Sequence, residues 1–462
     1  METALNYREN MSRSIALLLV IFLTATFTIV SSPVAAAPRT IFVPDDYPTI
    51  SAAIAKAGEG DTIFVKKGTY QEQTLEINKP LLLMGEDVNE TTVNLDPPLV
   101  ERMIFHNKLW VPSTAVIINA DNVKLSGLTI NMPRDEYGYG SGLSANGDRI
   151  EIVGNRIGNR ICLSLNGKWM SFTDNALTGN LGVDGSNHTI ARNSVDGSFE
   201  CQGAFNKIIE NKIIENPIYD DVNFNCTFSL IMGNSFLTVF LHSNSSFLSN
   251  NTFRCLTMKC SDNIVCNNRV TGRNLHSTTG DDLWGILLGE GSCNVFHDNL
   301  ITGYRYGIAV GGTHNVAERN TFYRNILMSN LEHVGTNWEV LGAGNSWDNG
   351  KEGNYWDDYR GSDNNGDGIG DVPYPVGGRR WWLDGGAFGQ DNYPLMAPFD
   401  ITSVSIELPD WANALLNAST GPQTLEHFSI VPVVALSVAT IAITSAGLLV
   451  YFRKRKRQAF TG

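Results

Sequence analysis

Short apolar segments recur along the middle of the chain, and each is built around one asparagine. Each segment reads as an apolar residue, two further residues, Asn, one further residue and a second apolar residue, as in IVGNRI (152–157) and FHDNLI (296–301). Runs of alternating apolar and polar positions, separated by Gly, Asn and Asp, predict short strands rather than helices. The asparagines are Asn155, Asn175, Asn193, Asn211, Asn234, Asn251, Asn268, Asn299 and Asn320, spaced 17 to 31 residues apart.

A repeat of this length predicts one coil of a parallel β-helix for each asparagine. Stacked coils lie about 4.8 Å apart, so asparagines at one position of every coil can pass side-chain hydrogen bonds along the stack as a ladder. Asparagine also tolerates the left-handed backbone that such corners need. The flanking apolar residues, such as Ile152 and Ile157, then point inward and stack on their equivalents. The segment LSGLTI keeps the register with Leu128 at the asparagine position, so the solenoid continues toward the N-terminus.

These repeats resemble the NosD and CASH (carbohydrate-binding and sugar-hydrolase) repeats. Residues 41–86 resemble the first turn of pectin-lyase-like, right-handed parallel β-helix proteins. That resemblance implies a short capping helix at roughly Ile50 to Ala57 and GDTIFVKKGTY (60–70) as the first strand. It covers roughly residues 40–400 and implies the fold better than the function, because one fold hosts many activities.

The expected fold is therefore all-β: a single right-handed parallel β-helix over residues 38–400 with an N-terminal helical cap. An Asp/Gly-rich C-terminal cap is expected at about residues 345–400. The cap sequence and the downstream QDNYPLM (390–396) resemble the C-terminal signature of archaeal surface proteins that carry such repeats. Residues 377–389 look like an insertion in that signature.

Two long apolar segments flank the solenoid. Residues 1–37 have the layout of a secretory signal peptide, with a retained anchor as the alternative. Residues 428–452 are long enough to cross a bilayer as one helix, and the basic tail 453–462 that follows belongs in the cytoplasm. Residues 401–427 would form a stalk. We expect a single-pass protein that displays its N-terminal domain at the cell surface.

The charge of the chain excludes one class of partner. The net charge is −13 at pH 7, and seven of the 34 basic residues but only two of the 47 acidic residues lie in the two flanking segments. The solenoid is therefore acidic, which argues against nucleic-acid binding and for a solvated surface or cation binding.

The loop SDNNGDGIGD (362–371) predicts a calcium site, because short oxygen-bearing side chains alternate around a glycine turn. The bidentate glutamate of an EF-hand is missing, and Asp357 or Asp358 is a candidate for the remaining oxygens. A metal-free cap made of turns is the alternative. The ligands would be the side chains of Asp363, Asn365, Asp367 and Asp371 and the backbone carbonyl of Ile369.

An acidic pair marks the longest gap between the repeat asparagines. Asp281 and Asp282 resemble the paired aspartates of polygalacturonases, which hydrolyse a glycosidic bond by acid and base action. The NTD, GHG and RIK elements of those enzymes have no counterpart at the expected places, so a solvated loop is favoured. A lyase would instead need an arginine base beside calcium, for which Arg305 is the candidate.

The resemblance to NosD also implies copper, because NosD serves the maturation of a periplasmic copper enzyme. Cys255, Met258 and Cys260 are soft ligands that suit Cu(I), although in a strand Cys255 faces away from the other two. Packing in the coil interior is the favoured role. The chain has seven cysteines, and Cys226 and Cys260, two coils apart, are too distant for a disulfide.

Tryptophans outside the repeat could stack on sugar faces, with Trp381 and Trp382 in the insertion as the main candidates. The leading hypothesis is a membrane-anchored surface protein that binds polysaccharide or envelope glycan, with calcium in the cap. The alternatives are a glycoside hydrolase or polysaccharide lyase, and a copper-binding assembly factor. The other candidates are Trp110, Trp284, Trp338 and Trp347, with packing within the fold as the alternative role.

Overall fold

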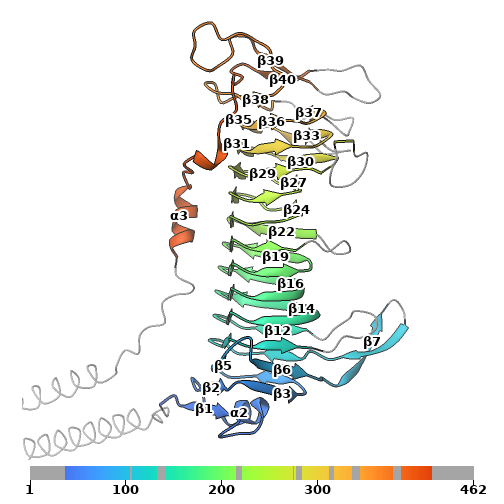
Figure 1. The fold of residues 1–462 in the computed structure, drawn as a ribbon, viewed down its shortest axis with the longest axis vertical. Helices are drawn as coiled ribbons and strands as arrows, with labels where there is room; N and C mark the ends of the chain where they lie inside the picture. The colour runs from blue at the N-terminus through green and yellow to red at the C-terminus, as the bar shows by residue number, and fades with distance from the viewer. Residues whose placement is uncertain are drawn as a thin grey trace, which may run out of the picture.

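The computed structural model is a solenoid of stacked coils (Figure 1). It describes residues 37–104, 107–132, 142–214, 221–273, 275–276, 283–311, 317–335, 344–377 and 387–418. The predicted signal peptide, apart from Ala37, and the predicted membrane-spanning segment lie outside these ranges. Within them, no helix is long and apolar enough to cross a membrane.

Three parallel sheets run along the solenoid, which agrees with an all-β, right-handed parallel β-helix. In the described residues sheet A has 13 strands, sheet B 18 and sheet C five. Sheet A stacks β1 (Thr40–Val43), β2 (Thr62–Val65), β5 (Leu82–Gly85), β10 (Lys124–Ser126), β13 (Glu151–Val153), β15 (Ser171–Thr173), β17 (Thr189–Ala191), β20 (Lys207–Ile209), β23 (Leu230–Met232), β25 (Phe247–Ser249), β28 (Ile264–Cys266), β31 (Val295–His297) and β35 (Thr321–Tyr323).

Sheet B forms the opposite wall and carries the longer strands. It contains β3 (Gly68–Glu72), β4 (Leu75–Ile77), β6 (Thr91–Leu95), β9 (Val116–Ile118), β11 (Thr129–Asn131), β12 (Leu143–Asn146), β14 (Arg156–Lys168), β16 (Ala176–Ser186), β18 (Ser194–Asp196), β19 (Phe199–Ala204), β21 (Lys212–Ile213), β22 (Asp221–Thr227), β24 (Thr238–Leu241), β27 (Cys255–Lys259), β30 (Trp284–Ser292), β33 (Tyr306–Val310), β34 (Ala317–Glu318) and β37 (Glu332–Gly335).

Sheet C and two antiparallel hairpins complete the strands. Sheet C contains β26 (Thr252–Phe253), β29 (Arg269–Thr271), β32 (Leu300–Thr302), β36 (Ile326–Met328) and β38 (Tyr355–Trp356). One hairpin, β7 (Leu99–Ile104) with β8 (Asn107–Pro112), projects from the solenoid near its N-terminal end (Figure 1). The other, β39 (Tyr374–Gly377) with β40 (Ala387–Asp391), belongs to the C-terminal cap.

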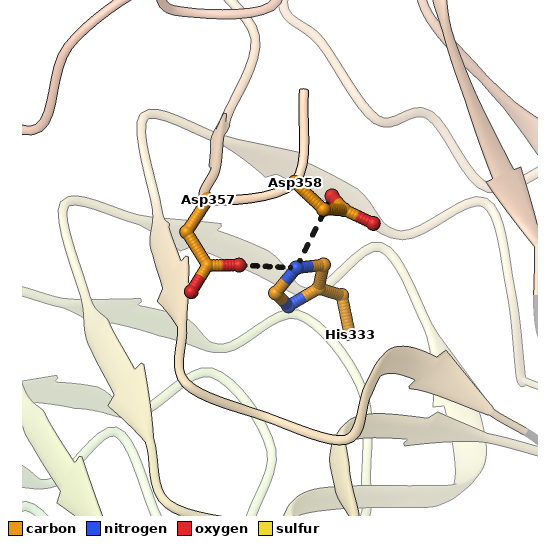
Figure 2. Close-up of side chains that lie close together, drawn as sticks. All are labelled: His333, Asp357 and Asp358. Carbon is orange, nitrogen blue, oxygen red and sulfur yellow. Dashed lines mark ion pairs between the residues drawn. The ribbon is translucent and has the colours of Figure 1, made fainter. Parts of the chain in front are cut away.

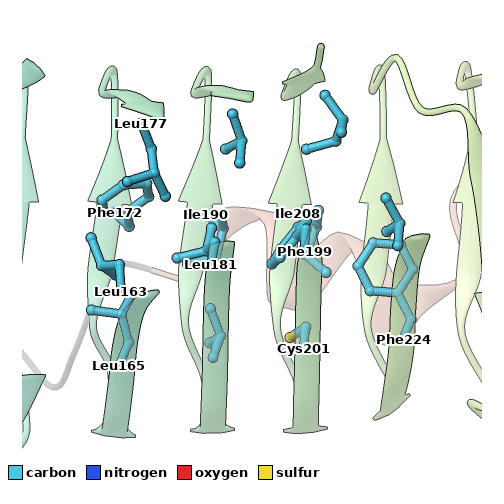
Figure 3. Close-up of a cluster of buried hydrophobic side chains, with 14 of the residues drawn as sticks. Leu163, Leu165, Phe172, Leu177, Leu181, Ile190, Phe199, Cys201, Ile208 and Phe224 are labelled. Atoms are coloured by element: carbon cyan, nitrogen blue, oxygen red, sulfur yellow. The ribbon is translucent and has the colours of Figure 1, made fainter. Parts of the chain in front are cut away.

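Equivalent apolar residues of successive coils stack in register inside the solenoid (Figure 3). Phe172 pairs with Ile190, and Ile190 with Ile208, on the sheet A side, and all three are fully buried. Leu181 pairs with Phe199 on the sheet B side. Each such side chain contributes about 1.5–3 kcal/mol on burial, so the core energy is spread along the whole stack.

The predicted asparagine ladder is present along one corner of the coils. The Oδ1 atom of Asn234 accepts hydrogen bonds from the backbone N of Asn211 at 2.8 Å and from its Nδ2 at 3.0 Å. The Nδ2 of Asn211 also donates to the carbonyl of Ile190 at 2.8 Å. The backbone N of Leu128 donates to Asn155 at 3.1 Å, which confirms Leu128 at the ladder position.

The ladder continues beyond Asn299 through a different residue from the one predicted. Asn299 bonds to Asn325, not to Asn320, and Asn325 bonds to Asn354. Asn320 instead belongs to a second ladder at the other end of the sheet A strands, where it bonds to Asn294. The placement of Asn320 in the first ladder was therefore wrong. The second ladder contains His188, Asn206, Ser229, Ser246, Asn263, Asn294, Asn320 and Asn345.

The left-handed backbone occurs one residue before the ladder asparagines, which corrects the prediction that the asparagines adopt it. Asp174, Arg192 and Glu210 precede three of them and have φ of 60°, 54° and 55°. The ladder residue then directly precedes the next strand, so it lies at the corner between two strands.

The N-terminal cap is the predicted helix, α2 (Ile50–Lys56). Ile50, Ala53 and Ile54 are buried against the first coils, and Thr49 caps the helix by accepting from the backbone N of Ala52 at 3.1 Å. The first strand is β1 rather than residues 60–70, because the chain enters sheet A before the helix. Residues 60–70 are divided between β2 and β3.

Residues 401–418, predicted as the first part of a stalk, lie on the outer face of sheet A (Figure 1). They contain a 3-10 helix, η2 (Ile401–Ser403), and helix α3 (Asp410–Asn417). Ala412 and Leu415 of α3 are buried in a small cluster with Leu230, Phe247 and Cys266. This cluster is separate from the core of the solenoid. We therefore expect the coils to stay folded when α3 dissociates from sheet A.

Leu415→Asp is therefore expected to release α3 from sheet A. Leu415 is 9% exposed, and burying a carboxylate in this cluster should cost about 2 kcal/mol or more. Limited proteolysis between residues 404 and 409 should become faster, while far-UV circular dichroism stays the same. Leu416→Asp is the matched control, because Leu416 on the same helix is 38% exposed and should not change cleavage. Equal cleavage of both variants would contradict the docking.

Candidate functional site

A row of polar side chains follows the outer face of sheet B. Strands β9, β12, β14, β16, β19, β22, β24, β27 and β30 pair in succession, and each places one polar residue at or next to its end at this position. The residue directly before each row residue on its strand, such as Leu165 before Asn166 and Val183 before Asp184, points into the core. We call this set the polar row: Asn119, Asn146, Asn166, Asp184, Gln202, Asn225, His242, Lys259 and Glu290.

The N-terminal part of the polar row is a hydrogen-bonded line of amides. Asn166 Nδ2 donates to Asn146 Oδ1 at 2.9 Å, and Asn146 Nδ2 donates to Asn119 Oδ1 at 3.0 Å. Ser144 and Ser164 accept from Asn146 and Asn166, each at 3.1 Å. The amide planes are therefore held in one orientation at the surface, where Asn119 and Asn146 are exposed and Asn166 is half-buried. Sequence reasoning did not identify this row, although the period of two in each strand carried its signal.

An exposed tryptophan lies on the hairpin that precedes the first strand of the polar row. Trp110 is 66% exposed on the hairpin β7–β8, which directly precedes β9 and its neighbour Asn119. Trp347, another predicted sugar platform, is instead buried and stacks on Phe322 with ring centroids 4.6 Å apart. That prediction for Trp347 was wrong, because the open end of the solenoid needs a large apolar side chain to cover it. Trp284 is half-buried at the start of β30.

A second polar cluster lies where the last coil of sheet B meets the C-terminal cap (Figure 2). His333 Nε2 lies 2.9 Å from Asp357 Oδ1 and 3.3 Å from Asp358 Oδ1. His333 is on β37 and is 7% exposed, while the two aspartates follow β38. Among the described residues, no other group of three His, Cys, Asp or Glu side chains converges so closely.

Each aspartate of this cluster is held from behind by a separate donor. Asp357 Oδ2 accepts from the backbone N of Ser329 at 2.6 Å, and Asp358 Oδ2 accepts from the hydroxyl of Tyr374 at 3.3 Å. Burial and the negative charge of Asp358 raise the pKa of Tyr374, so its hydroxyl stays protonated and remains a donor. Tyr374 stacks on Trp356 with centroids 4.4 Å apart. The pair of aspartates was predicted as a possible supplement to the calcium loop, and the structure places it around His333.

The predicted calcium loop is a series of tight turns in which the acids accept backbone hydrogen bonds. Asp363 accepts from Gly366 N at 2.7 Å and from Gly368 N at 2.9 Å. Asp367 accepts from Ile369 N at 2.9 Å, and Asp371 accepts from Asn364 N at 2.6 Å. Calcium binding by Asp363, Asn365, Asp367, Ile369 and Asp371 stays a prediction.

Of three other predicted groups, the structure describes only Arg305. Asp281 and Asp282 lie outside the described residues, as do Trp381 and Trp382. The backbone N of Tyr306 donates to the carbonyl of Leu283 at 3.0 Å, so Arg305 lies in the coil that follows the one containing Leu283. Its guanidinium stacks over the ring of Tyr306 at 5.5 Å from the centroid.

Five of the seven cysteines are buried, Cys162 and Cys293 are exposed, and none forms a disulfide in the described part of the chain. Met258 and Cys260 are buried, and Cys255 lies on the other face of β27 with its Sγ 3.9 Å from Thr257 Oγ1. The three sulfur atoms of the proposed copper set therefore do not converge on one side of the strand. Burial raises the pKa of Cys260 to about 12, so its thiol stays protonated. Cys226 and Cys260 are two coils apart, as predicted.

Comparison with known proteins supports the expected resemblance. The family described as "Periplasmic copper-binding protein (NosD)" matches residues 216–361. No curated protein sequence matches the chain. Similar solved structures include the A-module of the mannuronan C-5 epimerase AlgE6 from Azotobacter vinelandii, at 12% identity over 64% of this chain and 91% of that chain, with a TM-score of 0.44.

Two further structures are similar at the same level. The PL6-family alginate lyase AlyGC is 13% identical, covers 71% of this chain and 52% of its own, and has a TM-score of 0.46. The Dettilon tailspike protein is 14% identical over 67% of each chain, with a TM-score of 0.42. Residues 216–361 thus carry coils similar to those of NosD, within a parallel β-helix that extends beyond them toward the N-terminus.

Proposed function

We propose that this chain is a membrane-anchored, extracellular β-helix protein that binds polysaccharide or cell-envelope glycan along the polar row. The observation that carries the proposal is the hydrogen-bonded line of Asn119, Asn146 and Asn166 at the surface, which continues in register into Asp184 and Gln202. One polar group recurs in every coil, about 4.8 Å from the next. A polymer of similar units can repeat one contact along such a surface.

The chemistry of the polar row suits hydroxyl groups. An amide offers two donors and one acceptor, and a sugar hydroxyl both donates and accepts. Trp110 adds an apolar face at the N-terminal end of the row. From Asn119 to Asn225 the row holds amides and one carboxylate, followed by the imidazole of His242, and its first cation is Lys259. The acidic chain and this amide-rich stretch favour a neutral glycan over a polyuronate.

Replacing Asn146 and Asn166 together by alanine is expected to weaken glycan binding about 30-fold, because two amide contacts of about 1 kcal/mol each are lost. The measurement is affinity of the full-length chain for neutral and uronate polysaccharides by biolayer interferometry. Asn413→Ala on α3, exposed and on sheet A rather than sheet B, is the control and should bind as wild type. Binding that is unchanged in the double variant would contradict the proposal, as would binding confined to uronates.

A further inference from the structure

We propose that His333, Asp357 and Asp358 form a binding site for a divalent metal ion of the zinc class, which ties the last coil of the solenoid to its C-terminal cap. The three residues come from β37 and from the turn after β38, and their ligand atoms converge from two segments about one coil apart in sequence (Figure 2). The site is independent of the polar row and of the predicted calcium loop.

The spacing of the three atoms fits a common metal. Bonds of about 2.1 Å at tetrahedral or octahedral angles place neighbouring ligand atoms about 3.0 to 3.4 Å apart. The distances from His333 Nε2 to the two Oδ1 atoms are 2.9 and 3.3 Å, and all three atoms lie within 4.8 Å of one another. The two separations that involve His333 therefore match the spacing around a single ion.

Hydrogen bonding alone does not explain why two carboxylates meet at one imidazole nitrogen. Nε2 carries at most one hydrogen, whereas both Asp357 and Asp358 turn an oxygen toward it, so the two carboxylates would have to share a single donor. Two carboxylates at this separation repel each other unless a cation lies between them. Arg360 does not supply that charge, because its Nη1 atom donates to the backbone carbonyls of Asp357 and Tyr359.

Two hydrogen-bond donors behind the cluster orient the carboxylates of Asp357 and Asp358 toward His333. Ser329 N and the Tyr374 hydroxyl each occupy the second oxygen of one aspartate, so the first oxygen of each is left directed at His333. Such supporting hydrogen bonds orient the ligands of metal sites. The ring of His333 packs against Trp356 with centroids 5.8 Å apart, which restricts its rotation.

The ligand set defines the class of ion. One imidazole nitrogen with two carboxylate oxygens suits Zn²⁺, Co²⁺ or Mn²⁺, whereas Ca²⁺ takes six to eight oxygens. Three protein ligands also leave at least one position of the ion open to water.

The test is a titration of the metal-free, full-length chain with Co²⁺ followed by visible absorption, and with Zn²⁺ followed by calorimetry. We expect one equivalent of Zn²⁺, with affinity lowered at least 100-fold in Asp358→Asn and in His333→Gln. Tyr374→Phe should lower affinity about tenfold, because it removes only a supporting hydrogen bond. Quenching of tryptophan emission by Co²⁺ should report binding next to Trp356.

Asp371→Asn is the matched control, since it removes an acid of the neighbouring loop without touching the cluster. It should leave the Zn²⁺ affinity unchanged. Circular dichroism and the urea midpoint establish that each variant is folded. The proposal is overturned if the wild type binds neither ion, if Asp358→Asn binds as wild type, or if only Asp371→Asn loses binding.

Discussion

Asn234→Ala is expected to destabilise the coils around it by about 4 kcal/mol, because it removes four hydrogen bonds from the interior. The Oδ1 of Asn234 accepts twice from Asn211, and its Nδ2 donates to Ile208 O at 2.8 Å and to Asn251 Oδ1 at 2.9 Å. Asn234 is 1% exposed, so water cannot replace these partners. Native-state hydrogen exchange of the Asn211 amide and the urea midpoint by circular dichroism would measure the loss.

Asn225→Ala provides the control for this prediction. Asn225 lies on β22, close in sequence to Asn234, but its side chain is exposed on the outer face of sheet B. Its replacement should change stability by less than about 0.5 kcal/mol. If both variants lost the same small amount, the ladder would be a consequence of coil stacking and not a source of its stability.

The sequence carried the fold because the repeat uses the same residue type in each coil. The ladder from Asn155 to Asn299 was predicted correctly, since each asparagine sits between apolar residues that must stack. The last coils could not be assigned in the same way. AERNTF and FYRNIL both fit the pattern, and Asn320 and Asn325 are only five residues apart. Only the pairing of the strands shows that they lie at two different corners.

The candidate sites were much less accessible from the sequence. The polar row is defined by which residues of neighbouring coils are in register, and coils of 17 to 31 residues hide that register. His333 belongs to no motif, and it meets Asp357 only because one coil returns the chain to the same corner. The Asp-rich loop, in contrast, attracts attention by composition alone, although its acids already accept backbone hydrogen bonds.

The first ladder ends in a carboxylate instead of an amide, and this ending determines how the cap responds to pH. Asp391 Oδ2 accepts from Asn354 N at 2.6 Å and from Trp356 Nε1 at 2.9 Å, and its Oδ1 accepts from Tyr393 N at 3.0 Å. A Cβ atom at Gly353 would lie 1.7 Å from Asp391 Oδ1, so only glycine leaves room for this carboxylate. Burial raises the pKa of Asp391 from 3.8 to about 6.

A raised pKa means that the folded cap binds a proton more tightly than the unfolded chain does. The stability that this proton supplies is present below about pH 4 and is lost as the pH rises through about 6. A shift of about two pKa units corresponds to about 3 kcal/mol. Asp391→Asn removes the titration, so the difference in stability between wild type and variant should change by about 3 kcal/mol between about pH 4 and pH 7, with wild type relatively more stable at the lower pH.

Urea unfolding of the cap, followed by tryptophan emission at several pH values, would measure this difference. Comparing the two proteins at each pH cancels the contribution of every other titratable group, because those groups are common to both. A difference that stays constant from pH 4 to 7 would mean that the three N–H donors on Asp391 offset its burial and keep it ionised. The end of the ladder would then be a fixed charge, and the pH response of the cap would have to come from another group.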